Sequence, residues 1–102
     1  MTIQTIAIEH RRFDYSVGRA FRDRLQHAWA AGATTIVLDF SACVSMDSLG
    51  VSILVAAHRE RPAGARIVVC GLSEAVREVL EITQLHRIFD VYASADAARH
   101  AA

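Results

Sequence analysis

The sequence predicts a single α/β domain with a largely parallel sheet, and three observations support this prediction. The chain has 102 residues, a length that favours one domain spanning 1–102. Hydrophobic residues make up 53%, which is enough for a core and argues against disorder. Strand-like and helix-like segments alternate in the order β-α-β-α-β-α-β-α. This order predicts a four- to five-stranded, mostly parallel mixed sheet packed with about four helices through right-handed crossovers.

The first strand is predicted from alternation. Residues 2–9, TIQTIAIE, alternate the apolar Ile3, Ile6 and Ile8 with polar residues and are rich in β-branched side chains. We expect a strand with one buried face.

The first helix follows from a change of hydrophobic period. Residues 13–32 carry apolar side chains at spacings of three and four, which predicts an amphipathic helix. Asp14 or Ser16 can cap its start, and Gly32 suits the left-handed turn at its end.

The middle of the chain predicts a central strand and a second helix. Residues 34–40, TTIVLDF, form a continuous aliphatic run typical of a strand covered on both faces. Residues 48–61, SLGVSILVAAHRER, predict a helix that is apolar on most of its circumference. Pro62 and Gly64 end this helix.

The last third continues the alternation. Residues 65–71 predict a buried strand, and residues 73–85 predict an amphipathic helix with Ser73 as its cap. Residues 87–92 read as a short strand. Residues 94–102 form a short terminal helix, and this tip is expected to be frayed.

Composition excludes several classes of function. The formal net charge is zero, with 11 basic and 11 acidic residues, so we expect no nucleic-acid partner. No run approaches the roughly 20 apolar residues of a membrane span, and the start of the chain lacks a secretion signal. We therefore expect no membrane insertion and a cytoplasmic location. Cys43 and Cys70 are too isolated for a zinc site or a disulfide framework, and both are expected to be buried thiols.

The candidate enzyme sites are all incomplete. Residues 46–50 read Met-Asp-Ser-Leu-Gly, which lacks the first glycine of a nucleophile elbow. His58 would lie roughly 15 Å from Ser48 along the predicted helix, too far to act as its base. The chain has neither a phosphate-binding loop nor a lysine to complete one, and no cluster of metal ligands at close spacing. We therefore predict no enzyme activity, no cofactor and no metal.

The stretch CVSMDSLGVSIL, residues 43–54, is the strongest candidate site. Asp47 and Ser48 both cap helices well, and a cap contributes about 1 kcal/mol. A sheet can cover only one side of the apolar helix that follows, so a surface is left for a partner or for a homodimer. The candidate partner-binding residues are Asp47, Ser48, Leu49, Gly50, Ser52, Ile53 and Ala56.

Residues 13–98 resemble a STAS domain, the fold of anti-sigma-factor antagonists and of the cytosolic part of sulphate transporters. The resemblance is carried by IVLDFS, MDSLG, AAHRE, GARIVVCG and VREVLEITQLHRIF, in this order. The combination is specific, although each piece alone is weak.

The resemblance implies a substrate and switch, since in the bacterial antagonists the serine after the aspartate of this turn is phosphorylated. An anti-sigma factor with serine-kinase activity adds the phosphate, and a PP2C-type phosphatase removes it. The matching position is Ser48, between Asp47 and Gly50. The implied function is an anti-sigma factor antagonist in a partner-switching system, which binds the kinase while Ser48 is unphosphorylated. Leu49 stands where many antagonists have a second serine.

Two alternatives use the same fold. One is a STAS accessory subunit of an ABC-type lipid transport system, which docks on an ATPase subunit and needs no phosphate. The other is a scaffold in a larger signalling assembly. The neighbouring genes would discriminate among these functions.

Overall fold

The computed structural model describes residues 2–101 and has a four-stranded sheet at its centre. The strand order is β1-β3-β5-β6, and every neighbouring pair is parallel. The strands are β1 (Ile3–Ala7), β3 (Thr35–Asp39), β5 (Arg66–Cys70) and β6 (Asp90–Tyr92). The predicted α/β class is confirmed. Within the described part of the chain the sheet is wholly parallel, because each strand returns to the same end through a helical crossover.

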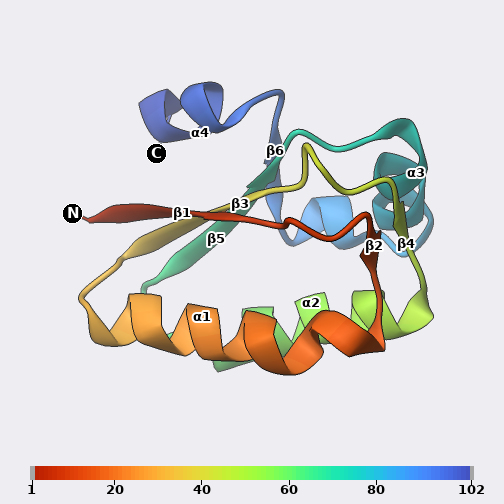
Figure 1. Ribbon diagram of the computed structural model, residues 1–102. Coiled ribbons are helices and arrows are strands. Elements are labelled where there is room, and N and C mark those ends of the chain that lie inside the picture. The colour runs from red at the N-terminus through yellow and green to blue at the C-terminus, as the bar shows by residue number, and fades with distance from the viewer. Residues whose placement is uncertain (1, 102) are drawn as a thin grey trace.

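The helices cover the two faces of this sheet unequally (Figure 1). α1 and α2 lie side by side against one face, α3 lies toward the carboxyl ends of the strands, and α4 lies against the opposite face. The helices are α1 (Gly18–Ala30), α2 (Ser48–Glu60), α3 (Glu74–Ile82) and α4 (Ala95–Ala101). Short 3-10 turns precede α1, at Tyr15–Val17, and follow α3, at Leu85–Arg87.

The central strand β3 is buried on both sides, as its continuous apolar run predicts. Ile36 and Leu38 belong to the main core, which also contains the buried side chains of α1 and α2. Val37 points the other way, into a smaller cluster with Cys70 and Ala98. Side chains alternate across a strand, so a strand between two apolar layers needs no polar positions.

The predicted burial of β1 is only partly correct. Ile6 and Ile8 belong to the main core, but Ile3 packs against the smaller cluster on the opposite face. The reason is parity: with a period of two, an odd-numbered residue cannot share a face with even-numbered ones in an unbroken strand.

The structure contains a second, two-stranded parallel sheet that the sequence pattern does not predict. It pairs β2 (Arg12–Phe13) with β4 (Ser45–Met46). Phe13 therefore belongs to a strand, and the helix predicted from residue 13 begins later. Asp14 accepts a hydrogen bond from the backbone N–H of Ser16 at 3.0 Å and caps the 3-10 turn that leads into α1.

The predicted helix over residues 73–85 and strand over residues 87–92 are too long. α3 ends at Ile82 because Gln84 adopts φ 62° and a 3-10 turn follows at Leu85–Arg87, so β6 begins only at Asp90.

The predicted caps and turn glycines agree with the structure. Ser73 Oγ accepts from Val76 N–H at 3.2 Å and caps α3. Gly32 and Gly64 adopt φ of 99° and 81°, where glycine avoids the strain of a side chain. α4 packs Ala98 fully buried, while the expected fraying of its tip stays a prediction. Within residues 2–101 no helix is long and apolar enough to cross a membrane.

Candidate functional site

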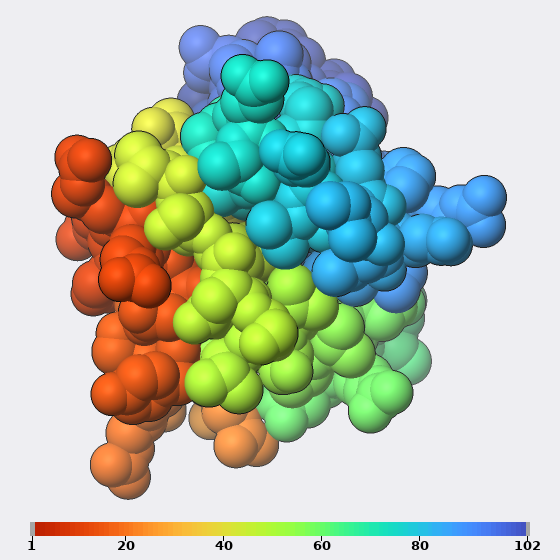
Figure 2. Space-filling view, turned by 90° about the vertical axis from the view of Figure 1, so that its right-hand side faces the viewer, coloured from red at the N-terminus to blue at the C-terminus, as the bar shows by residue number. Residues whose placement is uncertain are grey.

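The candidate site lies at the carboxyl end of the sheet, where segments distant in sequence meet (Figure 2). In this view the segment around β2, the segment from residue 41 into the start of α2, and the region of α3 adjoin one another on the surface. The segment 41–47 leads from β3 through β4 to α2. Sequence reasoning places Asp47 and Ser48 here, and the structure confirms that they stand where α2 begins.

Asp47 is the residue that caps α2. Its backbone is extended, with φ −105° and ψ −176°, and its carboxylate accepts from Gly50 N–H at 2.9 Å. Ser48 is the first residue of the helix itself. From the sequence, either residue could be the cap. The structure assigns this role to Asp47, because the side chain of the residue just before a helix can accept from the free N–H groups of its first turn.

The hydroxyl of Ser48 is therefore not needed to cap the helix. Ser48 is exposed, and within residues 2–101 no protein group forms a hydrogen bond with its Oγ. Its carbonyl accepts from Ser52 Oγ at 3.2 Å. A phosphate on Ser48 would stand in the first turn of α2, where free N–H groups and the helix dipole favour negative charge.

Gly50 lies beneath this surface. A Cβ on Gly50 would stand 2.1 Å from the Phe13 carbonyl oxygen and 3.0 Å from Met46 Cγ. Gly50, one of the predicted partner-binding residues, is buried. Because Gly50 has no side chain, β2 can approach the first turn of α2. The backbone N–H of Gly50 also donates the hydrogen bond that the Asp47 carboxylate accepts.

The apolar side chains of α2 differ in how far they are exposed. Val51, Ile53 and Val55 are half-buried and pack against the main core. Besides the sheet, α1 flanks this helix, and Phe89 packs against its His58. Of the candidate side chains, Leu49 is 52% exposed, and Asp47, Ser48, Ser52 and Ala56 are also exposed.

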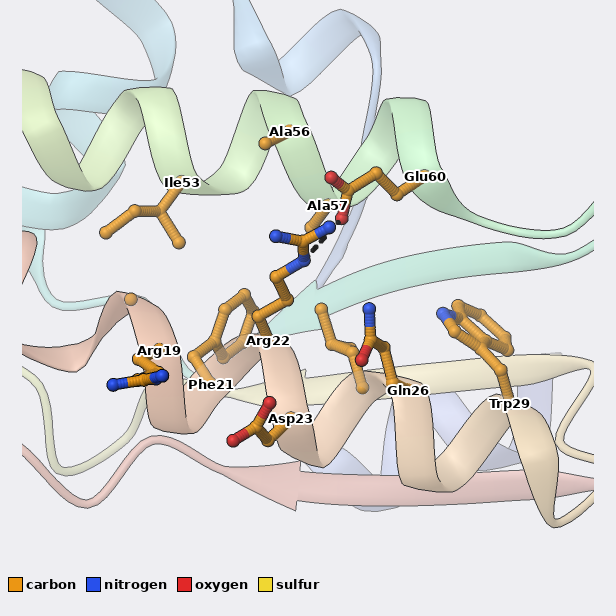
Figure 3. Close-up of a pocket in the computed structure, with 12 residues that line it drawn as sticks. Arg19, Phe21, Arg22, Asp23, Gln26, Trp29, Ile53, Ala56, Ala57 and Glu60 are labelled. Atoms are coloured by element: carbon orange, nitrogen blue, oxygen red, sulfur yellow. Dashed lines mark ion pairs between the residues drawn. The ribbon is translucent and has the colours of Figure 1, made fainter.

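A groove runs between α1 and α2 (Figure 3). It has a volume of about 670 Å³, and Ile53 and Ala56 line its α2 side. Arg22 of α1 reaches across it to Glu60 of α2, with Nε and Oε1 3.2 Å apart. Gly18 faces Ile53, whose Cδ1 would lie 3.2 Å from a Cβ at that glycine. Ile53 and Ala56 thus belong to this groove as well as to α2.

The segment before α2 is held from both flanks. Val44 N–H donates to the Arg11 carbonyl at 2.7 Å, and Asp47 N–H donates to the Phe13 carbonyl at 3.4 Å. From the other side, Ser73 Oγ donates to the Val44 carbonyl at 3.4 Å. Hydrogen bonds from the β2 segment and from the start of α3 therefore hold the backbone that leads to Asp47 and Ser48.

Two exposed apolar side chains at this end were not identified from the sequence. Val44 is 43% exposed, and Tyr15, just beyond β2, is 74% exposed. The signal that could have found them is an apolar residue within a polar loop. This signal can be interpreted only when the pairing of β2 with β4 is known. Val44 lies in the segment that leads to α2, and Tyr15 lies in the 3-10 turn that packs beside α2.

The two cysteines do not contribute a reactive group. Cys43 Sγ donates to the Ser45 carbonyl at 3.3 Å, and burial raises the pKa of its thiol. Burial and the nearby Asp39 charge raise the pKa of Cys70 to about 11. Both are free thiols that stay protonated at neutral pH. In the described part of the chain, no group of His, Cys, Asp or Glu residues is placed to hold a metal ion.

A family model described as STAS domain matches residues 11–98. No curated protein is a significant sequence match. Among solved structures, an anti-sigma factor antagonist from Mycobacterium paratuberculosis is similar at a TM-score of 0.82 and 23% identity, over 95% of this chain and 82% of its own.

Both forms of one further protein are similar to this chain. The unphosphorylated form of the anti-sigma factor antagonist SpoIIAA matches at a TM-score of 0.77 and 22% identity, over 99% of this chain and 90% of that one. The phosphorylated form of the Bacillus cell fate determinant SpoIIAA matches at 0.68 and 22%, over 96% and 89%. At these identities the likeness establishes the fold.

Proposed function

The chain belongs to the STAS domain family, and we propose that it is an anti-sigma factor antagonist switched by phosphorylation of Ser48. In this proposal it is a cytoplasmic binding module without enzyme activity. Unphosphorylated, it binds an anti-sigma factor with serine-kinase activity. That partner phosphorylates Ser48, and a PP2C-type phosphatase restores the binding form.

The observation that carries the proposal is the division of roles between Asp47 and Ser48. Asp47 caps α2 through its hydrogen bond with Gly50 N–H, which leaves the exposed Ser48 hydroxyl available to a kinase. A serine that capped the helix would have to give up that bond to be modified. The two solved forms of SpoIIAA support the same idea, since that protein exists with and without phosphate on a similar fold.

Phosphorylation should act on the interface more than on the fold. The phosphate adds nearly two negative charges beside Asp47, at a helix start that tolerates them. A partner that covers Leu49 must also desolvate this dianion. An unpaired buried charge costs several kcal/mol, and each 1.4 kcal/mol is a tenfold change in affinity. We therefore expect phosphorylation to weaken binding by about a hundredfold or more.

The test compares Ser48→Asp and Ser48→Ala with the parent for binding to the anti-sigma factors of the same genome. Ser48→Asp should weaken binding and leave the unfolding temperature nearly unchanged, whereas Ser48→Ala should bind and resist the kinase. Ser94→Asp is a matched control, because it places the same charge at the cap of α4, on the opposite face of the sheet.

Mass spectrometry after incubation with the kinase locates the phosphate. We expect it on Ser48, and a phosphate on Ser45 or Ser52 instead would contradict the proposal. A Ser48→Asp protein that binds its partner as tightly as the parent would contradict the switching mechanism.

A further inference from the structure

β1 forms an open edge of the central sheet. It stands at one end of the strand order and pairs only with β3. Ile8 N–H, just beyond the strand, donates to the Asp39 carbonyl at 2.8 Å. In a parallel ladder, alternate residues direct their backbone groups toward the same neighbour. The even-numbered residues therefore face β3, and the backbone groups that face outward are those of Ile3, Thr5 and Ala7.

One contact in the structure confirms this direction. The Ala7 carbonyl accepts from Arg24 Nη1 of α1 at 2.8 Å. A carbonyl has two lone pairs, so this one can accept a second bond. Within residues 2–101, the outward N–H and C=O groups of Ile3 and Thr5 have no hydrogen-bond partner. Such a row of donors and acceptors matches the backbone of another extended strand.

The composition of β1 leaves this edge unprotected. Its sequence is IQTIA, without a charged residue or a proline. Natural edge strands are commonly shielded by such residues or by being very short. The opposite edge is shielded in both ways, because β6 has three residues and its Asp90 pairs with Arg66. Of the two edges that the described residues form, the β1 edge is therefore the one suited to adding a strand.

We propose that β1 pairs antiparallel with β1 of a second copy of this chain, across a two-fold axis at Thr5. In this register the backbone of Thr5 exchanges hydrogen bonds with the backbone of Thr5 in the second copy. The backbone of Ile3 exchanges them with that of Ala7 in the second copy. The same patch serves both partners, as a two-fold interface requires. Thr–Thr cross-strand pairs are favourable, and the two four-stranded sheets join into one.

The charges around β1 permit this approach. Arg99 of α4 donates from Nη1 to Thr5 Oγ1 at 3.2 Å, close to the proposed axis, and its charge is balanced by Asp96. Arg24 lies at Ala7, toward the end of the strand and away from the axis. The formal net charge of the chain is zero, so two copies do not repel each other as a whole.

This surface is separate from the face that carries Ser48. Ile3 and Thr5 lie on the edge strand, whereas α2 begins at the far carboxyl end of the sheet (Figure 1). The dimer would leave Ser48 accessible in both copies. The proposal is therefore independent of the proposed function, and each can fail without the other.

Sedimentation of the protein over a range of concentrations tests the proposal. We expect a monomer–dimer equilibrium, with slower amide hydrogen exchange at Ile3 and Thr5 as the dimer forms. Thr5→Pro removes an outward N–H without touching the bonds to β3, and it should weaken dimerisation about tenfold or more. Thr5→Lys keeps the N–H but sets two like charges opposite each other, so it should also favour the monomer.

Ala75→Lys is the matched control, since it adds the same charge to an exposed position of α3, far from β1. It should dimerise like the parent, and unfolding temperatures verify that all variants are folded. A protein that stays monomeric at every concentration overturns the proposal. A dimer that forms equally well with Thr5→Pro and Thr5→Lys overturns it too.

Discussion

Asp47 and Ser48 are adjacent residues with different roles at the start of α2. The Asp47 carboxylate accepts from Gly50 N–H, while the Ser48 hydroxyl projects from the surface. A sequence can nominate both residues for the cap, because both types are common there. Deciding which of them is the cap requires the backbone angles of Asp47, which depend on the path of the chain from β4 into α2.

Of the two residues, only Asp47 should therefore lower the stability of the protein when it is replaced by alanine. We expect Asp47→Ala to lower the free energy of unfolding by about 1 kcal/mol, because one helix N–H loses its acceptor. Ser48→Ala should leave it nearly unchanged. Urea denaturation of both variants measures the difference, and an equal loss in both would contradict the assignment of the cap.

Gly50 provides a second test at the residue scale. Gly50→Ala would place a Cβ 2.1 Å from the Phe13 carbonyl oxygen, so β2 or α2 must move. We expect a loss of about 2 kcal/mol or more in the free energy of unfolding. Thermal and urea unfolding measure it.

Gly18→Ala is the control, because that Cβ meets only the flexible tip of Ile53 at 3.2 Å. Alanine is a better helix former than glycine by about 1 kcal/mol, which offsets the contact. A Gly50→Ala protein as stable as Gly18→Ala would show that β2 does not rest on the first turn of α2.

At the scale of elements, α2 is held near its C-terminal end by His58. The imidazole packs edge-on against Phe89, with ring centroids 5.6 Å apart, and Arg61 Nη1 lies 3.1 Å from its ring nitrogens. Burial lowers the pKa of His58, and the charge of Arg61 lowers it further. The contact between α2 and the segment after α3 therefore favours the neutral ring.

This contact predicts a pH dependence of stability. Since the folded pKa lies below the unfolded value near 6.5, the stabilisation is fully present above about pH 6.5 and is lost as the pH falls through the folded pKa. His58→Gln should flatten the stability profile in this range. His27→Gln, at an exposed position of α1, is the control, and an unchanged profile in His58→Gln would contradict the prediction.

The elements that could be predicted are those whose pattern lies within one segment. The period of α1, the apolar run of β3 and the Ser73 cap of α3 can be recognised without knowing their neighbours. β2 could not be predicted, because two residues are too few to show a period and pairing with β4 alone makes them a strand. The cover that α1 gives Ile53 is likewise a matter of tertiary packing.

At the scale of the whole molecule, the two thiols report on opening of the core. Cys43 and Cys70 are buried, and burial raises the pKa of both. We expect neither to react with a thiol reagent in the folded protein at mildly alkaline pH, and both to react once denaturant unfolds the chain.

Mass spectrometry of the labelled protein distinguishes global from local opening. Labelling of Cys43 before Cys70 would mean that the segment before α2 opens on its own, despite its bonds to Arg11 and Ser73. Rapid labelling of Cys70 under native conditions would contradict the burial of the central sheet.

The position of the candidate site could be predicted from the sequence, but its composition could not. The MDSLG turn locates Ser48 at the start of a helix, because a strand, a cap and an apolar period follow one another there. Tyr15 and Val44 join the same end of the molecule only through the pairing of β2 with β4. Contacts between segments distant in sequence leave no local pattern.

The bond from Arg99 to Thr5 ties the last helix to the first strand. In Figure 1 the start of β1 and α4 lie at one side of the molecule, and α2 begins at the other. A sensor chip or a fluorescent label attached beside α4 would therefore leave the start of α2 at the opposite side of the molecule. The same layout makes the domain suitable for force measurements, in which pulling on β1 and α4 would load these two elements first and the turn at the start of α2 last.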